Sequence, residues 1–423
     1  MSSAMSSATS SATTIEDKTE SSAAPVPGTG HQGQTFLVGD DIYLRRIELA
    51  DAPFGMSWRG VRYPQSSDRV ETWIKEEMAK DRDTAWYAIV RKADDRVVGS
   101  ARVGRAGGLA ASLTLRVDPL LGDCGLHLKA EALKLLAPWV VEEQNRPMLL
   151  MFQAADEPAM IAAAGEIGMR QTARFRQRIA RDSERVDELV FQYLSPRWLG
   201  LIGDPDAVEL ERTGTGQPRP VPPRVTLDGD PPKNAVMVGQ RVYLRPFEPG
   251  DAVEEATWTR REPETFFDIG RHLWSSVGGA HWREEVQKKT LPDFVGFSVC
   301  LRESDEFIGG VDLIGVDYWN RYAETGSYFH RSDYRGGGYG SEAKQLLLEY
   351  AFETLGLHSL QSWVYFQNTR SAAALRKQGY TEAGRINWLY PNKGTLDNFV
   401  VFDLLASEWR AMPRAAWDSP SSA

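Results

Sequence analysis

The sequence contains little cysteine and no long apolar run. Its 423 residues include only Cys124 and Cys300, which lie far apart and form no CxxC pair. The sequence therefore indicates neither a disulfide framework nor a cysteine-based metal site, and we expect a metal-free protein of the reducing cytoplasm. The densest apolar run, residues 133–141, is interrupted by Lys134 and Pro138. It is far shorter than the ~20 apolar residues of a membrane helix, so we expect no membrane span.

The sequence also lacks a surplus of basic residues. Lysine and arginine number 49 against 58 aspartate and glutamate residues, which gives a net charge of −9. This balance repels nucleic acids and anionic membranes at long range, so it disfavours both as partners. A local basic cleft remains compatible with it.

The first 34 residues contain few apolar side chains. They are rich in Ser, Ala and Thr and carry neither the basic region nor the apolar region of a secretory signal. Such a segment cannot bury enough surface to offset its ordering entropy, so we expect residues 1–34 to be a disordered leader and residues 413–423 a flexible tail.

The rest of the chain contains a long-period repeat. GDDIYLRRIELADA from Gly39 and GQRVYLRPFEPGDA from Gly239 are identical at 7 of 14 positions. Further matches follow at an offset that drifts from 200 to about 214, including EALKLL from Glu131 with EAKQLL from Glu342. We therefore predict two domains of one fold, residues 35–202 (the first half) and residues 237–412 (the second half).

Residues 203–236 lie between the two halves and contain seven prolines. Proline fixes φ and removes a backbone donor, so this connector is expected to be a semi-rigid, extended linker and not a packed segment.

The periodicity of the second half indicates a mixed fold. Strands are predicted at residues 242–247, 297–302, 307–315, 323–330, 360–366 and 399–405, with helices at 341–356 and 369–378. We expect an α/β or α+β fold with a mostly antiparallel sheet that leads into one βαβ unit.

A glycine-rich segment, YRGGGYGSEAKQLL from Tyr334, lies between a predicted strand and a strong helix. Free amides in the first turn of a helix and the helix dipole favour an anion there, and glycines allow it to approach the backbone. A flexible turn that caps the helix is the simpler interpretation. The segment has neither the Lys-Ser/Thr ending of a Walker motif nor the acidic residue of a Rossmann fingerprint.

The RGGGYG motif resembles the acyl-CoA signature of the GNAT acyltransferase superfamily. Its surroundings, including RYAETGSYF, FQNTRSAAALRKQGY and TLDNFVVFDLL, are similar to the ribosomal-protein N-acetyltransferase branch and span most of residues 237–410. The resemblance implies tandem folds, each with a twisted mixed sheet flanked by helices. It also implies pantetheine bound between the fourth and fifth strands, which splay apart, and an acyl-CoA, most simply acetyl-CoA, as co-substrate. The donor-binding residues implied are Tyr328, Phe329, Arg335, Gly336, Gly337, Gly338, Tyr339, Gly340, Ser341 and Asn368.

Glu324 is the candidate general base. It lies on the strand that leads to the glycine-rich segment, and the resemblance places a base at or near this position. A solvated strand glutamate is the alternative. Acyl transfer to an amine needs such a group because the ammonium must lose its proton before it attacks.

The general acid is less clearly marked. The resemblance offers Ser371, three residues after Asn368, whereas the more common family tyrosine is replaced by Leu375. Tyr380 or water could supply the proton instead. Asn368 itself could serve as a helix N-cap.

The first half departs from the motif. Aligned on the shared Glu-Ala pair, Cys124 replaces Arg335, and His127 and Lys129 replace two glycines of the motif. Side chains there should obstruct a pyrophosphate, so we expect a domain that has lost ordinary acyl-CoA binding. A different anion bound by His127 and Lys129 is the alternative. The expected roles of the first half are scaffolding, completing the acceptor cleft or docking a partner.

Several aromatic side chains are ambiguous. His330 is expected to be a surface or hydrogen-bonded histidine, and His358 to be structural. Trp258, Trp274, Trp282 and Trp319 fall where an acceptor wall would lie, although tryptophans there are usually core.

We therefore expect an N-acyltransferase that moves an acyl group from acyl-CoA to a primary amine, on a small molecule or a protein N-terminus, in the second half. One alternative donor is a thioester on a carrier protein or an aminoacyl-tRNA, with the first half as docking surface. Another alternative is a non-catalytic scaffold.

Overall fold

The computed structural model describes residues 36–209, 217–259, 275–392 and 394–415. The predicted leader, residues 416–423 of the predicted tail, and Trp274 lie outside this range.

The first half contains eight strands and five α-helices among its described residues. The strands are β1 (Leu37–Val38), β2 (Ile42–Arg46), β3 (Ala85–Arg91), β4 (Arg96–Gly107), β5 (Ala110–Val117), β6 (Met148–Ala154), β7 (Arg170–Arg181) and β8 (Glu184–Leu194). The helices are α1 (Gly55–Trp58), α2 (Ser67–Glu76), α3 (Gly122–Pro138), α4 (Pro158–Glu166) and α5 (Pro196–Ile202).

The described part of the second half has the same succession of strands. These are β9 (Met237–Val238), β10 (Val242–Pro246), β11 (Phe294–Leu301), β12 (Phe307–Asp317), β13 (Tyr322–Tyr328), β14 (Ser359–Tyr365), β15 (Thr381–Asn392) and β16 (Thr395–Leu405). The helices are α6 (Pro249–Thr259), α7 (Ser276–Gln287), α8 (Tyr339–Glu349), α9 (Thr369–Lys377) and α10 (Ala406–Ala411). Each strand and helix predicted for this half is present, and β9, β15, α6, α7 and α10 are additions.

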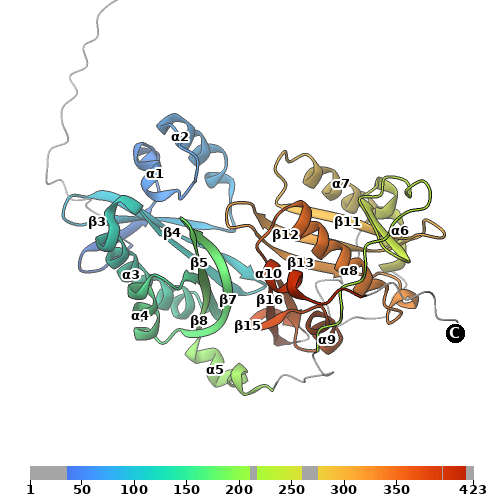
Figure 1. The fold of residues 1–423 in the computed structure, drawn as a ribbon. Helices are drawn as coiled ribbons and strands as arrows, with labels where there is room; N and C mark the ends of the chain where they lie inside the picture. The colour runs from blue at the N-terminus through green and yellow to red at the C-terminus, as the bar shows by residue number, and fades with distance from the viewer. Residues whose placement is uncertain (1–35, 210–216, 260–274, 393, 416–423) are drawn as a thin grey trace, which may run out of the picture.

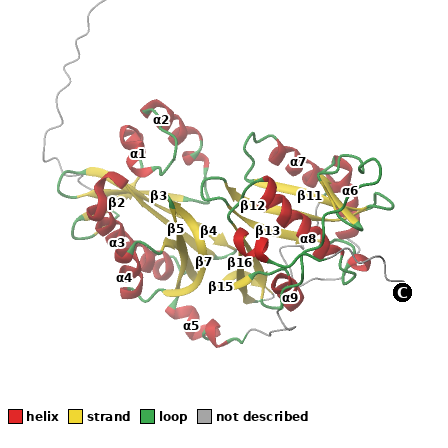
Figure 2. Cartoon of the chain, in the orientation of Figure 1, coloured by secondary structure: helices red, strands yellow, loops and turns green. Residues whose placement is uncertain are grey.

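The strands form one continuous sheet in the order β1-β2-β3-β4-β5-β6-β8-β7-β15-β16-β14-β13-β12-β11-β10-β9. The order is palindromic, because β7 and β15 meet in the middle and each half then continues outward in the same sequence (Figure 1). Helices flank the strands in both halves (Figure 2). The expected mixed, mostly antiparallel fold is confirmed.

One strand pair in each half is parallel and short. β13 pairs with β14 through residues 322–324 and 359–361, and β5 pairs with β6 through residues 111–113 and 149–151. Both pairs of strands continue beyond these residues without further pairing in the described chain. The strands therefore separate, as the resemblance predicts.

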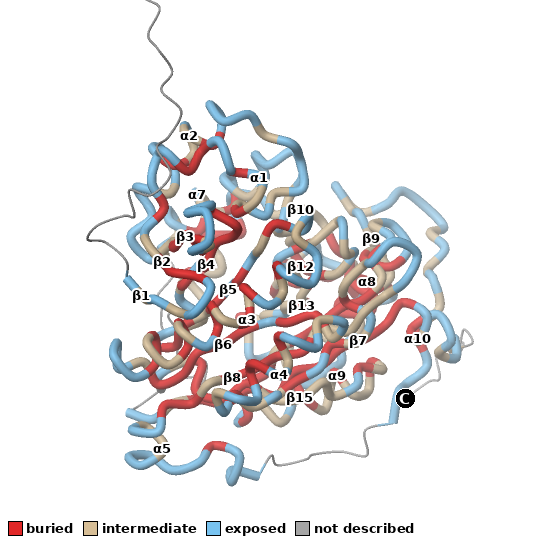
Figure 3. Tube along the Cα trace, turned by 90° about the vertical axis from the view of Figure 1, so that its left-hand side faces the viewer, coloured by how far each residue is buried: buried red, intermediate tan, exposed pale blue. Residues whose placement is uncertain are grey.

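Buried residues follow the sheet strands, whereas α5 and many loops are exposed (Figure 3). Each half has its own apolar core, with Leu133 in one and Leu347 in the other. A third core joins Phe175 of β7 to Ile386 of β15 and Val401 of β16, so the halves share buried apolar surface as well as a sheet.

The connector differs from the prediction. Pro205–Ala207 form a short 3-10 helix, and Val221 is buried in the core of the second half and pairs with Arg414 in a β-bridge. The Val221 amide donates to Pro413 and its carbonyl accepts from Ala415. The interpretation of an unpacked linker is therefore wrong at Val221, because an apolar side chain between prolines gains more by burial than by exposure.

Candidate active site

The glycine-rich segment forms the turn between β13 and α8. Gly336 and Gly338 have φ values of +90° and +87°, and Gly338 is the N-cap of α8. Only glycine adopts such angles without strain. The first-turn amides of α8, from Tyr339 onward, have no intrahelical acceptor and lie directly after this turn.

Side chains around the turn fix its shape. The Arg335 guanidinium donates from Nε and Nη2 to the Phe329 carbonyl, at 2.9 and 2.7 Å, so it ties the turn to the end of β13. The Arg241 guanidinium donates to the Gly337 carbonyl at 2.8 Å and lies 4.5 Å from the centroid of the Tyr339 ring. The turn within the predicted donor-binding residues 335–341 is thus supported by the residue before β10 and the residue after β13.

Asn368 caps α9. Its Oδ1 accepts a hydrogen bond from the Ser371 amide at 3.1 Å, which confirms the N-cap interpretation. Leu375 is buried in the core. Tyr380 is also buried, and its hydroxyl lies 2.9 Å from Oγ1 of Thr325, the first residue of β13 beyond the paired segment. Tyr380 therefore lies beside the gap between the splayed strands.

Glu324 is the last residue of β13 to pair with β14, opposite Gln361. Its side chain is partly exposed, and its carboxyl has no hydrogen-bond partner among the described residues. Burial raises the pKa of Glu324 to about 7, although the cations of Arg178 and Lys344 act to lower it. A carboxyl with a pKa near neutrality can take up and release a proton at ordinary pH.

Sequence reasoning missed two charged residues of the second half, Lys344, which interacts with Glu324, and Asp312, which interacts with Lys344. Lys344, on α8, is buried, and its Nζ donates to the Gly326 carbonyl at 3.3 Å. Burial lowers the pKa of Lys344 to about 7, against the effect of Asp312 and Glu324. Burial likewise raises the pKa of Asp312, on β12, to about 7, and Oδ1 of Asp312 is buried without a hydrogen-bond partner in the described chain.

The same framework in the first half is apolar. A uniform interval of 211 residues relates the paired strands β4 and β5 to β12 and β13. It also relates Glu131 to Glu342, each of which accepts a hydrogen bond from the backbone amide of the residue just before β2 or β10. At this interval Asp312, Glu324 and Lys344 correspond to residues that are all buried: Ala101, Leu113 and Leu133. Charges at these three positions are therefore dispensable for the fold.

An ion pair crosses the corresponding gap of the first half. Lys129, at the position of Gly340, lies 2.6 Å from the carboxylate of Glu157, which precedes α4 as Asn368 precedes α9. Both side chains are largely buried. His127 lies on the exposed surface, 3.6 Å from Asp41. Lys129 is thus neutralised by the protein itself.

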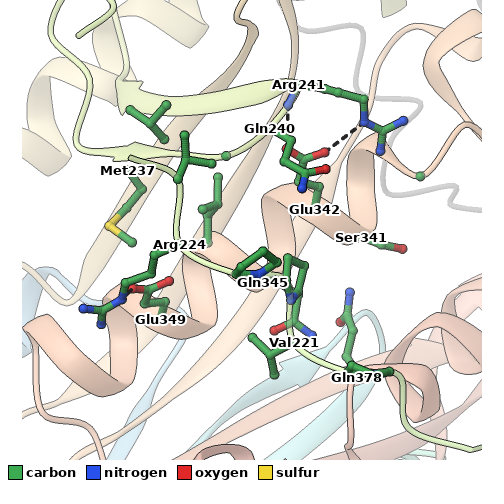
Figure 4. Close-up of a pocket in the computed structure, with 18 of the residues that line it drawn as sticks. Val221, Arg224, Met237, Gln240, Arg241, Ser341, Glu342, Gln345, Glu349 and Gln378 are labelled. Atoms are coloured by element: carbon green, nitrogen blue, oxygen red, sulfur yellow. Dashed lines mark hydrogen bonds and ion pairs between the residues drawn. The ribbon is translucent and has the colours of Figure 1, made fainter. Parts of the chain in front are cut away.

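A cavity of about 510 Å³ lies beside the glycine-rich turn (Figure 4). Gly338, Ser341 and Gln345 line one side, and the connector, including Val221 and Arg224, lines another. Arg224 of the connector forms an ion pair with Glu349, the last residue of α8. The connector therefore contributes a wall to a cavity that begins at the predicted donor-binding turn.

The other candidates have structural contacts. His330 is buried, with its ring centroid 4.7 Å from that of Phe307, which excludes the surface position among the two expected, surface or hydrogen-bonded. His358 lies 3.0 Å from Oε1 of Gln177 in the first half. Trp282 contacts Phe294, and the Arg331 guanidinium lies over Trp258.

Trp319 is half exposed and packs against Tyr63, with ring centroids 5.6 Å apart. It thus belongs to the boundary between the halves. None of the described helices has both the length and the apolarity that a bilayer crossing requires.

Comparison with known proteins agrees with this geometry. Residues 241–381 match the family model described as "Acetyltransferase (GNAT) domain". The N-acetyltransferase p20 of Bacillus licheniformis, described as uncharacterized, is 33% identical over 113 residues, which are 27% of this chain and 63% of that protein. The chain thus spans less than two thirds of that relative. The "Probable N-acetyltransferase YjcK" of Bacillus subtilis is 29% identical over 35% of this chain and 85% of its own length.

Among solved structures, a spermidine N-acetyltransferase of Vibrio cholerae, in complex with CoA and spermine, is 20% identical. It covers 40% of this chain and 98% of its own, with a TM-score of 0.35. That likeness is too distant to indicate a substrate here. The resemblance noted in the sequence is confirmed by the family model and the named relatives. The second half of the chain therefore contains a match to the GNAT acetyltransferase domain over residues 241–381.

Proposed function

We propose that the second half transfers an acyl group, most simply acetyl, from acyl-CoA to a primary amine, with Glu324 as general base. The observation that carries this proposal is the position of Glu324 at the point where β13 and β14 separate, with its pKa raised to about 7 by burial. A base with this pKa is ionised often enough at neutral pH to accept the proton of an ammonium group.

The glycine-rich turn fits the pyrophosphate of CoA. Gly336 and Gly338 hold a backbone conformation closed to other residues, and the first-turn amides of α8 are available for an anion. When bound, the donor supplies an activated acyl thioester. Residues 335–341 would hold its phosphates, and the unpaired ends of β13 and β14, with Tyr328, Phe329 and Asn368, would hold the pantetheine arm.

The chain's own residues then divide the proton transfers. Glu324 accepts the proton that the acceptor amine must lose before it attacks. Ser371, in the first turn of α9, gives its proton to the departing sulfur and receives in turn the second proton that the attacking nitrogen loses as the amide forms. The unpaired carboxyl of Glu324 is suited to the first step because no hydrogen bond within the described chain restrains it.

The first half, in this proposal, is a second domain of the same fold without a donor site. The ion pair between Lys129 and Glu157 supports this, because it occupies positions that correspond to Gly340 and the cap of α9. Titration calorimetry of the whole chain with acetyl-CoA should give one site per chain. A stoichiometry of two would contradict the assignment.

Intact-mass screening of an amine library with acetyl-CoA and longer acyl-CoAs tests the activity. Glu324→Gln should lower product formation by roughly 10²–10⁴-fold, whereas the matched control Glu303→Gln, which removes an exposed carboxylate of the same half, should not. Equal turnover by both variants would rule out the proposed base. An absence of product from the unmodified chain with every donor and amine would rule out the activity.

A further inference from the structure

One arginine of the first half reaches the candidate active site of the second. Arg178, on β7, is 8% exposed, and its Nη1 donates to Oε1 of Gln361 at 2.9 Å. Gln361 is the residue that pairs with Glu324 across β13 and β14. The guanidinium also lies 3.9 Å from the centroid of the Tyr322 ring, two residues before Glu324.

Arg178 is held from its own side as well. The Glu188 carboxylate, on β8, lies 2.9 Å from Nη1, and the Phe175 ring lies 4.9 Å from the guanidinium carbon. A buried arginine with a carboxylate, an amide and two aromatic faces around it has a fixed position. Arg178 is therefore a rigid extension of the first half into the second.

The corresponding contact from the second half to the first carries no charge. β7 and β15 are related by the interval of 211 residues, so Leu389 on β15 corresponds to Arg178. Leu389 is buried in the shared apolar core. It extends toward the first half, where its backbone carbonyl lies near Gly107 and Gly108. At this pair of related positions, a positive charge therefore crosses the boundary toward the half that contains Glu324 and not in the reverse direction.

We infer that the first half completes the active site of the second, with Arg178 as a positioning residue that holds Gln361 and Tyr322 beside Glu324 and keeps a positive charge near its carboxyl. This inference rests on the proposed function, because it takes Glu324 as the base. It assigns the first half a part in the reaction, beyond that of a scaffold.

The physical effect follows from the charges around Glu324. Arg178 from β7 and Lys344 from α8 favour its ionised form, while burial opposes it. Asp312 from β12 faces Lys344, Glu188 from β8 faces Arg178, and Tyr390 from β15 interacts with Glu324. Without Arg178, the effect of burial on the pKa of Glu324 would be opposed by less positive charge. Most Glu324 carboxyls would then be protonated at neutral pH and unable to act as a base.

The test uses the full chain with Arg178→Met and Glu188→Gln together, so that no buried carboxylate is left unpaired. The pH dependence of kcat/KM should show its acidic limb displaced upward by about one pH unit, because an opposite charge nearby typically lowers a carboxyl pKa by 1–3 units. The maximal rate at high pH should be largely retained. Arg178→Lys, which keeps the charge, should restore much of the original profile.

Arg176→Met is the matched control. Arg176 lies on the same strand and also crosses to the second half, where it pairs with Asp403 at 2.6 Å and with Glu408, but it does not contact Gln361. This variant should lower the melting temperature without moving the acidic limb. If both changes lower stability alike and neither moves the limb, the first half is only a scaffold and the inference is wrong.

A readout independent of turnover separates this inference from the proposed function. The carboxyl titration of Glu324 can be followed by carbon NMR and assigned with Glu324→Gln. The pKa should rise in the Arg178→Met and Glu188→Gln variant whether or not an acceptor has been found. An unmoved titration would overturn the inference even if the chain proves to be an amine acetyltransferase.

Discussion

Ala173 of β7 lies opposite Gly384 of β15, and these two residues are themselves separated by the interval of 211 positions that relates the two halves. The pair therefore marks the approximate two-fold axis of the sheet, where each half meets its counterpart. Gly384 has a φ of +139°, and a Cβ there would collide with the Thr172 carbonyl and lie 2.8 Å from the Ala173 Cβ.

Gly384→Ala should therefore destabilise the junction by at least about 2 kcal/mol, because backbone strain and steric overlap act together. Urea denaturation followed by tryptophan fluorescence measures the change. Gly394→Ala is the matched control, since Gly394 also has a positive φ but no atom within 4 Å of the added Cβ. Equal losses would mean that backbone strain alone, and not the close approach of the halves, requires glycine at position 384.

Gly338→Ala should weaken acetyl-CoA binding at least tenfold. The φ of +87° disfavours alanine, and the added Cβ would lie 3.1 Å from Nη2 of Arg241, so the side chain that supports the turn must move. Calorimetry compares its affinity with that of Gly356→Ala, at a positive φ with no atom near the added Cβ. The control should lose stability but keep its donor affinity; a parallel loss of affinity would contradict the assigned site.

The rate of acyl transfer should fall as the pH drops below about 7. The pKa of Glu324 is raised, so the base is protonated on the acidic side of that value and ionised above it. The acidic limb should vanish in Glu324→Gln, with kcat lower by roughly 10²–10⁴-fold. The pH dependence of uncatalysed aminolysis of the same thioester by the same amine shows which part of the profile comes from ionisation of the acceptor amine. A limb that survives in the variant would assign it to another group.

Replacing the three charges of the second half by their counterparts should stabilise the protein. The variant combines Asp312→Ala, Glu324→Leu and Lys344→Leu, which reproduces Ala101, Leu113 and Leu133 of the first half. Removing buried ionisable groups in favour of apolar ones typically gains about 1–4 kcal/mol. Urea denaturation at pH 7 should show the gain, while acyl transfer is lost. A less stable variant would mean that the charges support the fold.

Ser371→Ala should lower kcat by tenfold or more at saturating donor, since the hydroxyl is the proposed acid. Tyr380→Phe is the informative comparison, because the Tyr380 hydroxyl is buried against Thr325 and burial raises its pKa. It should cost stability but leave kcat within about threefold. The opposite ranking of the two variants would transfer the role of acid to Tyr380.

Local patterns were sufficient to predict much of this molecule. Neighbouring residues alone predict the strand before the glycine turn, α8, α9 and the cap at Asn368. The repeat was found by comparing the chain with itself. The sequence also singled out Glu324. It could not reveal Lys344, because a lysine within an amphipathic helix ordinarily faces water, whereas here the side chain is buried by the fold.

Arg178 was missed for a different reason. Its partners, Tyr322 and Gln361, are more than a hundred residues away and belong to the other half, so no local pattern connects them. The packed connector was missed for the same reason: burial of Val221 depends on α8 and residues after α10, which are brought together only by the fold.

The palindromic sheet also determines how the two sites can diverge. In a homodimer built around the same axis, every substitution at the junction would occur twice, so an arginine that entered one site would enter both. Here the two crossing positions are encoded separately in one gene, as Arg178 and Leu389. A single chain can thus carry a polar site in one half and an apolar site in the other, although the two halves are related by an approximate two-fold axis. Identical subunits cannot differ in this way.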